Sequence, residues 1–527
     1  MIDPASSPAP HQAAGSSGRQ VALMFLAFAL VASFPIASHP LPPLLDYPNH
    51  LARMHVIAAI GTDPDLSRFY EIEWQIIPNL MMDMIVPLLA PAIGLYRAGQ
   101  AFMLITIVLI MSGALALNRA MFGNWSLLPL AVAPLIYNRI FIVGLMNYMF
   151  GVGLAIWGLA VWIWLRERAW PLRLAASGLF ALALFFCHLF ALGIYGLGLL
   201  AVESWRLRTK RDRPLPRRIG EFLAAGLPFV PIMALLLSSP TWGLSGENHW
   251  DTQGKFDGLL AVIETYSDVV DWTLFAIAAA AAVWAARRRA LRLHPVGWIV
   301  LALGGIVYLA MPGVMFSTYL ADQRLPIALV FMIMSCARLE LHGRAQQAAL
   351  LGLLGFLLVV RVAEVSLTWT DLSRDTLALR DSVKRIEPRG SRVLVAQSDA
   401  TDKDEARDYG LAHAACLAVI ERSALVSTLF TAAGKQIVHA RLPYRNQVET
   451  GDGDLPSTEQ LASAAERAPA PSAGDRPPYW LLWQDRFDYV YVVFTERDAA
   501  NPLPDLLTLV DDGDRFQLYK VKKPLVE

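Results

Sequence analysis

Charged residues are scarce in this chain, and most of them lie outside a series of long apolar blocks. Asp, Glu, Lys and Arg make up 17% of the 527 residues, against about 25% in soluble proteins. The mean hydropathy is +0.42, and blocks with almost no charge follow one another from Val21 to Val362. This excludes a soluble enzyme for that part of the chain and predicts an α-helical polytopic membrane protein.

The chain has no net charge and few cysteines. Lys and Arg number 45, as do Asp and Glu, so no overall field attracts nucleic acid and no such partner is expected. The three cysteines, Cys187, Cys336 and Cys416, are too few for a disulfide framework or a thiolate metal site. Residues 371–527 contain no GxGxxG, Walker or CxxC pattern, which argues against nucleotide binding there.

Eleven segments are apolar and long enough to be read as membrane helices. They are residues 20–38, 100–117, 126–141, 145–165, 172–187, 189–204, 219–238, 271–286, 296–311, 324–340 and 346–366. The first is expected to be an uncleaved anchor that follows a disordered tail, residues 1–18, rich in Pro, Ala, Ser and Gly. Pro78–Leu95 is expected to lie on or dip into the outer face, because a full crossing there would invert the loops after it.

The loops between these segments differ in charge. Four are basic, namely Arg166–Arg173, Trp205–Arg218, Arg287–Arg292 and Arg338–Arg344. Under the positive-inside rule they face the cytoplasm. The loops 40–99 and 239–270 are acidic on balance and are predicted to lie outside. The expected location is the bacterial inner membrane, with a cytoplasmic N-terminus and a periplasmic C-terminal domain.

The residues after the last apolar segment predict a small periplasmic α/β domain, residues 371–527, attached to a transmembrane domain of residues 19–370. Charged residues return there, and short β-rich runs appear. The expected strands are Arg392–Gln397, Leu425–Phe430, Tyr489–Phe494, Leu507–Val510 and Phe516–Val521, the last two forming a hairpin. A helix is expected over Glu405–Glu421, and residues 446–478 are expected to be a loop.

Polar residues gather at the outer ends of the predicted helices in five short clusters. The five are Asp46–Arg53, which contains Asn49 and His50; Tyr137–Arg139 together with the nearby Asn147 and Tyr148; His188 alone; Gly246–Asp251, which contains His249; and Ser317–Pro326, which contains Asp322, Gln323 and Arg324. Ionisable residues close to apolar membrane segments are rare and are often functional. Five clusters on one face therefore predict a cavity that opens outward.

Each cluster also has an ordinary structural interpretation. Asp46 precedes Pro48 and could simply cap a helix. His188 could be a hydrogen-bonded cap, and Asp322 could pair with Arg324. Arg139 is harder to explain in this way, because a cation among apolar residues at the interface favours an anionic partner such as a lipid phosphate.

The order and sidedness of these motifs resemble the GT-C glycosyltransferases, integral membrane enzymes that use polyprenyl-phosphate sugars. The likeness extends in particular to the protein mannosyltransferase and aminoarabinose transferase group, and it covers most of the chain. It is carried by Leu45–His50, Pro78–Arg97, Leu117–Gly123, Asn147–Gly151, Cys187–Phe190, Asp322–Pro326 and the final strand-like Phe516–Lys520.

The resemblance implies roles for particular residues. Asp46 matches the family's catalytic acid, a general base that takes a proton from the acceptor. Many members carry a second acid beside the first, but here Tyr47 follows Asp46. A second acid would have to come from Glu71, Glu73, Asp83 or Asp251. The remaining candidates are Arg324, Arg139 and Arg53 for the lipid phosphate, Asn49, His50, His249 and Asp251 near the acceptor or a metal, and Asp322, Gln323, Asn147, Tyr148 and His188 as supporting residues.

A divalent metal, Mg²⁺ or Mn²⁺, is left open by the resemblance, because some members of the family use one and others do not. The candidate ligands are Asp46, His50 and His249. The sequence contains no compact ligand spacing such as HExxH.

The sequence therefore predicts an inverting glycosyltransferase that moves a sugar from a polyprenyl-phosphate carrier to a periplasmic cell-envelope acceptor, which is a glycan or a lipid. Membrane lipids are expected to surround the protein. One alternative is a lipid or oligosaccharide transporter or flippase without catalysis. Another is an envelope-assembly scaffold whose outer domain binds a partner protein. The charges lie at the outer ends of the apolar segments rather than at their centres, which favours the enzyme over a transporter.

Overall fold

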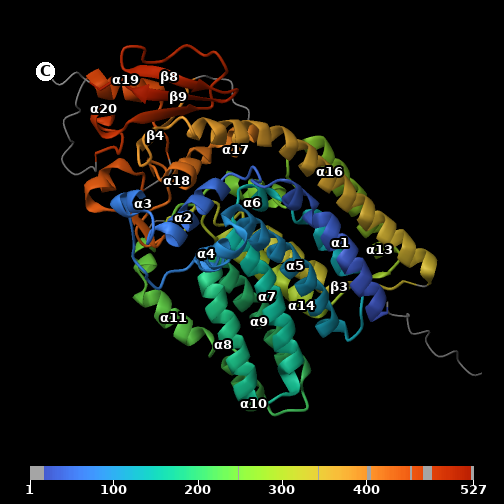
Figure 1. Cartoon of the computed structure of the whole chain (residues 1–527). Coiled ribbons are helices and arrows are strands. Elements are labelled where there is room, and N and C mark those ends of the chain that lie inside the picture. The colour runs from blue at the N-terminus through green and yellow to red at the C-terminus, as the bar shows by residue number, and fades with distance from the viewer. Residues whose placement is uncertain are drawn as a thin grey trace, which may run out of the picture.

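The computed structural model is a bundle of long helices with a smaller sheet-containing layer over one end (Figure 1). It describes residues 17–246, 248–341, 343–399, 405–450, 454–466 and 477–523. The predicted disordered tail therefore lies almost entirely outside the described residues.

Among the described residues, eight helical stretches are long and apolar enough to cross a membrane, and each covers one of the predicted segments to within a residue. They are α1 (Gly18–Ser38), α5 (Leu95–Phe122), α7 (Met146–Trp164) with the 3₁₀ turn η2 (Leu165–Glu167), α8 (Trp170–Cys187), α9 (Leu189–Thr209), α10 (Leu215–Ala224) with α11 (Phe229–Ser238), α13 (Asp268–Arg287) and α16 (Arg344–Val383). The polytopic helical fold is thus confirmed. The total number of crossings stays a prediction, because three of the eleven segments are not among these eight stretches.

The segment 126–141 is not an α-helix, which corrects the prediction. It forms the 3₁₀ helix η1 (Leu128–Leu135), which contains Pro129 and Pro134. A proline in a helix interior removes a backbone donor and clashes with the preceding turn. The segment still runs along α1, because Trp125 packs on Gly18 at the start of α1 and the Tyr137 hydroxyl donates to the Ala32 carbonyl (2.6 Å). These two points on α1 are about 21 Å apart at 1.5 Å per residue.

Two further segments form short helices, and only the second of them is shorter than predicted. The helix α14 (Pro295–Ala310) has 16 residues, and α15 (Leu325–Ser335) has 11. The predicted helix 324–340 is wrong beyond Ser335, because β3 (Ala337–Leu339) pairs antiparallel with β2 (Leu291–Leu293). The buried Asn118 amide donates to the Ser335 and Ala337 carbonyls (2.9 and 2.6 Å), and so binds two carbonyls where the helix ends.

The first outer loop folds into short helices that pack on the bundle. It contains α2 (Tyr47–Ala59), α3 (Pro64–Phe69), the strand β1 (Tyr70–Ile72) and α4 (Met81–Ile93). A separate helix at 78–95 was predicted and is present; it ends at Gly94, whose φ of +84° suits glycine. Short elements also follow α5 and α11: α6 (Arg139–Ile142), η3 (Pro240–Leu244) and α12 (Gln253–Leu260).

The C-terminal layer contains a five-stranded sheet in the order β5-β4-β7-β9-β8. The parallel strands are β4 (Arg392–Gln397), β5 (Leu425–Val426) and β7 (Tyr489–Val493); β9 (Phe516–Val521) runs antiparallel to β7 and to β8 (Leu507–Asp512). The small α/β domain and its final hairpin are confirmed.

Three details of this layer differ from the prediction. The helix expected over Glu405–Glu421 is broken into α17 (Glu405–Leu411), η4 (Ala414–Cys416) and α18 (Leu417–Arg422), and the strand expected over Leu425–Phe430 ends at Val426. The expected loop 446–478 contains α19 (Thr458–Glu466), while its residues 451–453 and 467–476 lie outside the described ranges. The remaining short elements are β6 (Val438–Ala440), η5 (Leu442–Gln447) and α20 (Trp483–Arg486).

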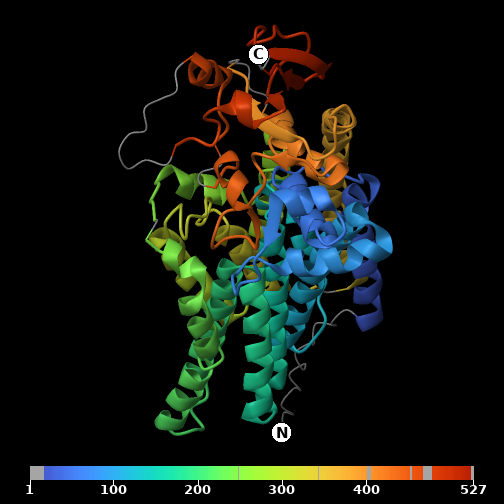
Figure 2. The ribbon, with the colours of Figure 1, turned by 60° about the vertical axis from the view of Figure 1, so that its left-hand side comes forward.

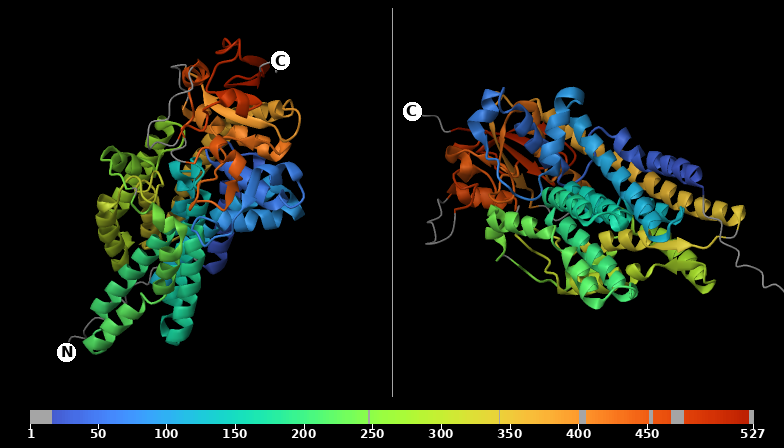
Figure 3. Two further views of the ribbon diagram at one scale, coloured as in Figure 1. Left: turned by 90° about the vertical axis from the view of Figure 1, so that its left-hand side faces the viewer. Right: turned by 90° about the horizontal axis from the view of Figure 1, so that it is seen from below.

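The C-terminal layer is joined tightly to the helical part. The helix α16 has 40 residues, about 60 Å at 1.5 Å per residue, or twice the hydrocarbon thickness of a bilayer. It continues through the predicted boundary at residue 371 and packs beside α1, as Figure 3 shows. The strand β1 of the first outer loop pairs with β6 of the C-terminal part. The two parts therefore meet over the end of the bundle where α2 and α4 lie.

The basic loops gather at the other end of the bundle. Figure 2 shows α10 and the adjoining ends of α8 and α9 far from the C-terminal layer. The pairing of β2 with β3 brings the loops 287–292 and 338–344 together, and Trp205 contacts His294 (ring centroids 6.3 Å apart). This grouping agrees with the charge-based assignment of these loops to one side of the membrane.

We expect labelling to show which end faces the cytoplasm. A cysteine at the exposed Thr508 in β8 should react with a membrane-impermeant maleimide in intact spheroplasts, and one at the exposed Thr209 should react only after lysis. Background should be low, because Cys187, Cys336 and Cys416 are buried. The opposite pattern would place the C-terminal layer in the cytoplasm.

Candidate active site

A cavity of about 430 Å³ lies between the helical bundle and the C-terminal layer. Its walls come from the start of α2, the turn before α7, the junction of α8 and α9, the loop 315–324 and the C-terminal residues 430–436. Apolar side chains such as Leu45, Met146, Phe190 and Phe316 alternate with polar ones. This size and mixed lining are typical of a small-molecule site.

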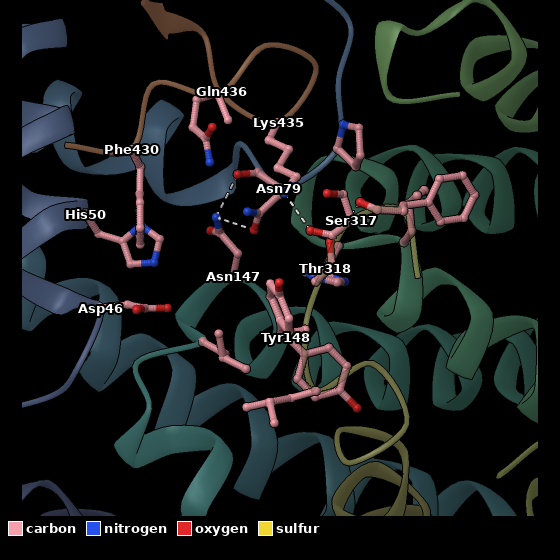
Figure 4. A pocket seen from close by; sticks show the side chains of 18 of the residues that line it. Asp46, His50, Asn79, Asn147, Tyr148, Ser317, Thr318, Phe430, Lys435 and Gln436 are labelled. Atoms are coloured by element: carbon pink, nitrogen blue, oxygen red, sulfur yellow. Dashed lines mark hydrogen bonds between the residues drawn. The ribbon is translucent and has the colours of Figure 1, made fainter. Parts of the chain in front are cut away.

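Asp46 projects into this cavity (Figure 4). It precedes α2, but its side chain makes no capping hydrogen bond, so the helix-cap interpretation does not account for the carboxylate. Its N–H donates to the Val143 carbonyl (3.0 Å). Gly144 has a φ of +92°, and a Cβ there would lie 3.1 Å from the Asp46 nitrogen. Glycine thus lets the turn before α7 hold the Asp46 backbone closely.

Burial raises the pKa of Asp46 to about 7, although the positive charges of Arg324 and Arg53 oppose this rise. A carboxyl group with such a pKa exists near neutral pH in both forms. It is therefore suited to accept a proton from a reacting group and to release it afterwards.

His413 of the C-terminal layer faces the same carboxylate. Its Nε2 lies 3.6 Å from Asp46 Oδ1, and burial lowers the pKa of His413 to about 4, so the ring is neutral. The Asn49 amide fixes the tautomer, because its oxygen accepts from the Phe430 N–H (2.9 Å) while its NH₂ donates to the Thr428 carbonyl (2.7 Å). The same NH₂ faces His413 Nδ1 at 3.2 Å. Nδ1 is therefore the acceptor, and Nε2–H points toward Asp46.

Asn49 and His50 thus connect α2 to the C-terminal layer. The His50 ring packs edge-on against Phe430 with centroids 5.7 Å apart, and His413 does the same at 5.0 Å. Burial and the nearby Arg53 charge hold the pKa of His50 well below its ordinary value. His50 of α2 and His413 of the C-terminal layer therefore pack on the same Phe430 ring, and all three side chains line the cavity with Asp46.

Arg324 is buried in another wall of the cavity. Its side chain donates to His188 Nε2 (2.8 Å) and to the carbonyls of Tyr319 (2.7 Å) and Leu320 (3.2 Å). The Tyr148 hydroxyl donates to the backbone carbonyl of Arg324 (2.6 Å). Predicted supporting residues, His188 and Tyr148, therefore do contact Arg324.

Lys435 and Asn79 form the polar wall opposite Asp46 (Figure 4). Lys435 Nζ donates to the Ser317 carbonyl (2.5 Å), which ties the C-terminal layer to the loop 315–324. Asn147 holds Asn79 through its NH₂ (2.9 Å to the carbonyl and 3.0 Å to the side-chain oxygen). The Asn147 oxygen accepts from the Met82 N–H at the start of α4 (2.7 Å). The cavity thus carries cationic groups on two walls and an acid on a third.

Two of the arginines proposed for the phosphate lie outside the cavity lining. Arg53 forms a buried bidentate ion pair with Asp83 of α4 (2.5 and 2.8 Å). Arg139 pairs with Glu264 (3.1 Å) near the surface. Arg53 is close enough to act on Asp46 through its charge, but both guanidinium groups are bound to carboxylates in the protein.

The outer loop 239–270 also contributes less than predicted. Asp251 accepts from the N–H groups of Gln253 and Gly254 at the start of α12, and His249 pairs through its backbone with Val314. Asp322 forms an ion pair with Lys255 (2.8 Å) and not with Arg324, and Gln323 is buried beside it. None of these side chains lines the Asp46 cavity.

Of the three predicted metal ligands, Asp46 and His50 line the cavity and His249 does not. Within the part of the chain that the structure describes, no group of three or more His, Cys, Asp or Glu side chains is placed to hold a metal ion. The Asp46 carboxylate faces the N–H of His413 rather than a second ligand. The donors present do not fit a divalent metal, and we assign no step to one.

The sequence interpretation missed every residue that the C-terminal layer contributes. His413, Phe430 and Lys435 line the cavity, and so does Glu449. Glu449 was not among the residues considered as a second acid beside Asp46. No local motif marks these residues. His413 lay in a predicted helix, Phe430 ended a predicted strand and Glu449 lay in a predicted loop, whereas Lys435 lay in a segment without a recognisable pattern.

No protein-family model matches this sequence, and no curated protein sequence matches it. The solved structures of similar fold include two of ArnT from Cupriavidus metallidurans. The chain is 13% identical to the structure bound to undecaprenyl phosphate, with a TM-score of 0.50, over 96% of this chain and 98% of that one. The apo structure gives 14% identity and a TM-score of 0.48 over the same shares. The chain therefore has the fold of the GT-C membrane glycosyltransferases, as its motifs suggested.

Proposed function

We propose that this protein is an inverting glycosyltransferase that moves a sugar from a polyprenyl-phosphate carrier to an acceptor of the bacterial cell envelope, at the periplasmic face of the inner membrane. The observation that carries the proposal is one amphipathic cavity containing the Asp46 carboxylate and the Arg324 guanidinium. The GT-C fold supports it, as does the undecaprenyl phosphate bound to the ArnT structure of similar fold.

The carrier phosphate would bind at Arg324, with Lys435 adding positive charge from the wall opposite Asp46. Three of the five guanidinium N–H groups of Arg324 are accounted for by His188, Tyr319 and Leu320, and the fork of the others suits a phosphate. The apolar residues Leu45, Phe190 and Phe316 would contact the first isoprene units. A charge-assisted site of this kind stabilises the phosphate most strongly as its charge grows on leaving.

Asp46 would act as the general base. An acceptor hydroxyl oxygen forms a bond to the anomeric carbon while the bond from that carbon to the phosphate oxygen breaks. The hydroxyl proton passes to Asp46, and polyprenyl phosphate leaves with the bonding electrons. Attack opposite the phosphate inverts the anomeric configuration. His413, whose N–H faces Asp46, would be a positioning residue that keeps the carboxylate directed into the cavity.

A transfer assay tests the proposal directly. Purified protein in lipid nanodiscs should release undecaprenyl phosphate from a labelled undecaprenyl-phosphate sugar and transfer the label to an envelope fraction that contains glycans and lipids. The anomeric configuration of the product should be opposite to that of the donor. A transporter would move the labelled lipid across a vesicle membrane without releasing undecaprenyl phosphate, and a scaffold would do neither.

A further inference from the structure

A second cavity, also of about 430 Å³, lies beside the Asp46 cavity and beneath the β1–β6 pair. Thr431 and Gly434 line both cavities, so the loop 431–434 is the wall between them. Gly434 has a φ of +77°, and its carbonyl accepts from the Thr241 hydroxyl (2.7 Å). The outer loop 239–270, which contains Thr241, thereby holds this wall in place.

Two buried polar side chains that line the second cavity have atoms without a partner. Thr431 is 4% exposed, and its hydroxyl has no hydrogen-bond partner among the described residues. His439 is 8% exposed, and its Nδ1 donates to the Thr431 carbonyl (3.2 Å). Its Nε2 is then an acceptor, and it too has no partner within the described part of the chain. Buried polar groups in native proteins are nearly always hydrogen-bonded, so unpaired ones indicate a missing ligand or water.

The mouth of the cavity carries no excess of positive charge. Glu73 and Arg445 line it and are about half exposed, with their charged groups 3.9 Å apart. Arg445 also pairs with Glu71 of β1 (3.1 Å). An arginine held between two carboxylates offers little attraction to a free anion, so a phosphate or a nucleotide is not the ligand that this lining favours.

The apolar part of the lining is small. It consists of Pro240, Ala433, Ala440 and Val448, whereas the Asp46 cavity contains Leu, Met and Phe side chains. Acyl chains need extended apolar surface to leave water or lipid, and the second cavity does not provide it. A hydroxyl group both donates and accepts hydrogen bonds, and so matches a wall that mixes His439, Thr431, Gln75 and Glu73.

We propose that the second cavity binds the acceptor, and that the acceptor is a carbohydrate rather than a lipid. This inference rests on the proposed function and names the class of substrate on which it acts. The carbohydrate would enter from the aqueous side past Glu73 and Arg445. One of its hydroxyl groups would reach past Thr431 and Gly434 to Asp46, give up its proton there and bond to the anomeric carbon of the donor sugar as the phosphate leaves.

The variant Thr431→Val tests this, because it removes the hydroxyl and keeps the shape of the side chain. With short soluble oligosaccharides as acceptors, the KM for the oligosaccharide should rise roughly tenfold, as expected for one lost hydrogen bond. The KM for the donor lipid and the kcat should change little. Thr376→Val is the matched control, since Thr376 is a buried threonine of α16 that lines neither cavity.

Two further measurements separate the acceptor inference from the proposed function. A phospholipid fraction serves as the second acceptor arm, and saturation-transfer NMR detects oligosaccharide binding without any donor. Transfer to phospholipid alone, unaffected by Thr431→Val, would overturn the inference and leave the glycosyltransferase proposal standing. If no acceptor releases undecaprenyl phosphate, the proposed function fails. NMR then still decides whether wild-type protein binds oligosaccharides and the variant binds them less well; no binding by the wild type would overturn the carbohydrate site.

Discussion

Replacing Asp46 with Asn should lower kcat/KM for sugar transfer by roughly a hundredfold or more, the usual contribution of a general base. The amide has the shape of the carboxylate but cannot take a proton from the acceptor. Folding should be nearly unaffected, because the Asp46 side chain makes no capping hydrogen bond to α2. Binding of undecaprenyl phosphate, measured by ligand-dependent thermal stabilisation, should also be retained. Wild-type turnover by Asp46→Asn would show that another group is the base.

The pH dependence of the wild-type enzyme provides a second measure of the same group. The active form of Asp46 is the carboxylate, and burial raises its pKa to about 7. The value of kcat/KM should therefore be low under acidic conditions and rise with pH through a midpoint near 7, since kcat/KM reports the free enzyme. The residual activity of Asp46→Asn should lack this midpoint.

The elements of the fold that follow simple periodic patterns could be predicted from the sequence. The strands at 392–397 and 516–521 were located to the residue, because apolar and β-branched residues there are bounded by turn residues. Hydropathy measures the length of an apolar run and not the type of helix that it forms. The segment 126–141 was therefore misassigned, since Pro129 and Pro134 favour the 3₁₀ form of η1.

The site residues that lie next to apolar segments were predicted from the sequence. Contacts between residues that are far apart in the sequence were missed. Asp46, Arg324, Tyr148 and His188 converge on one cavity as expected. The ion pairs of Arg53 with Asp83 and of Arg139 with Glu264 join residues 30 and 125 positions apart. No local pattern reveals such pairs. The same holds for His413, which meets Asp46 only because the C-terminal layer folds back onto α2.

Replacing Arg324 with Ala should weaken binding of undecaprenyl phosphate by about tenfold to a hundredfold, the value of one or two charge-assisted hydrogen bonds. Transfer should fall further, because the phosphate gains charge as it leaves. Arg324→Lys keeps the charge but loses the planar fork, so its binding and transfer should be intermediate between those of Arg324→Ala and the wild type. Arg139→Ala is the matched control, since Arg139 pairs with Glu264 outside the cavity lining.

The pH profile distinguishes a phosphate-binding charge in the cavity from a purely structural arginine. The positive charge of Arg324 lowers the pKa of Asp46, against the effect of burial. Without that charge the pKa of Asp46 should rise above 7, and the ascending limb of kcat/KM should move to higher pH. Arg324→Lys should keep the limb near its wild-type position, and so should Arg139→Ala. An Arg324→Ala enzyme that binds undecaprenyl phosphate normally, with an unshifted limb, would place the carrier phosphate elsewhere in the molecule.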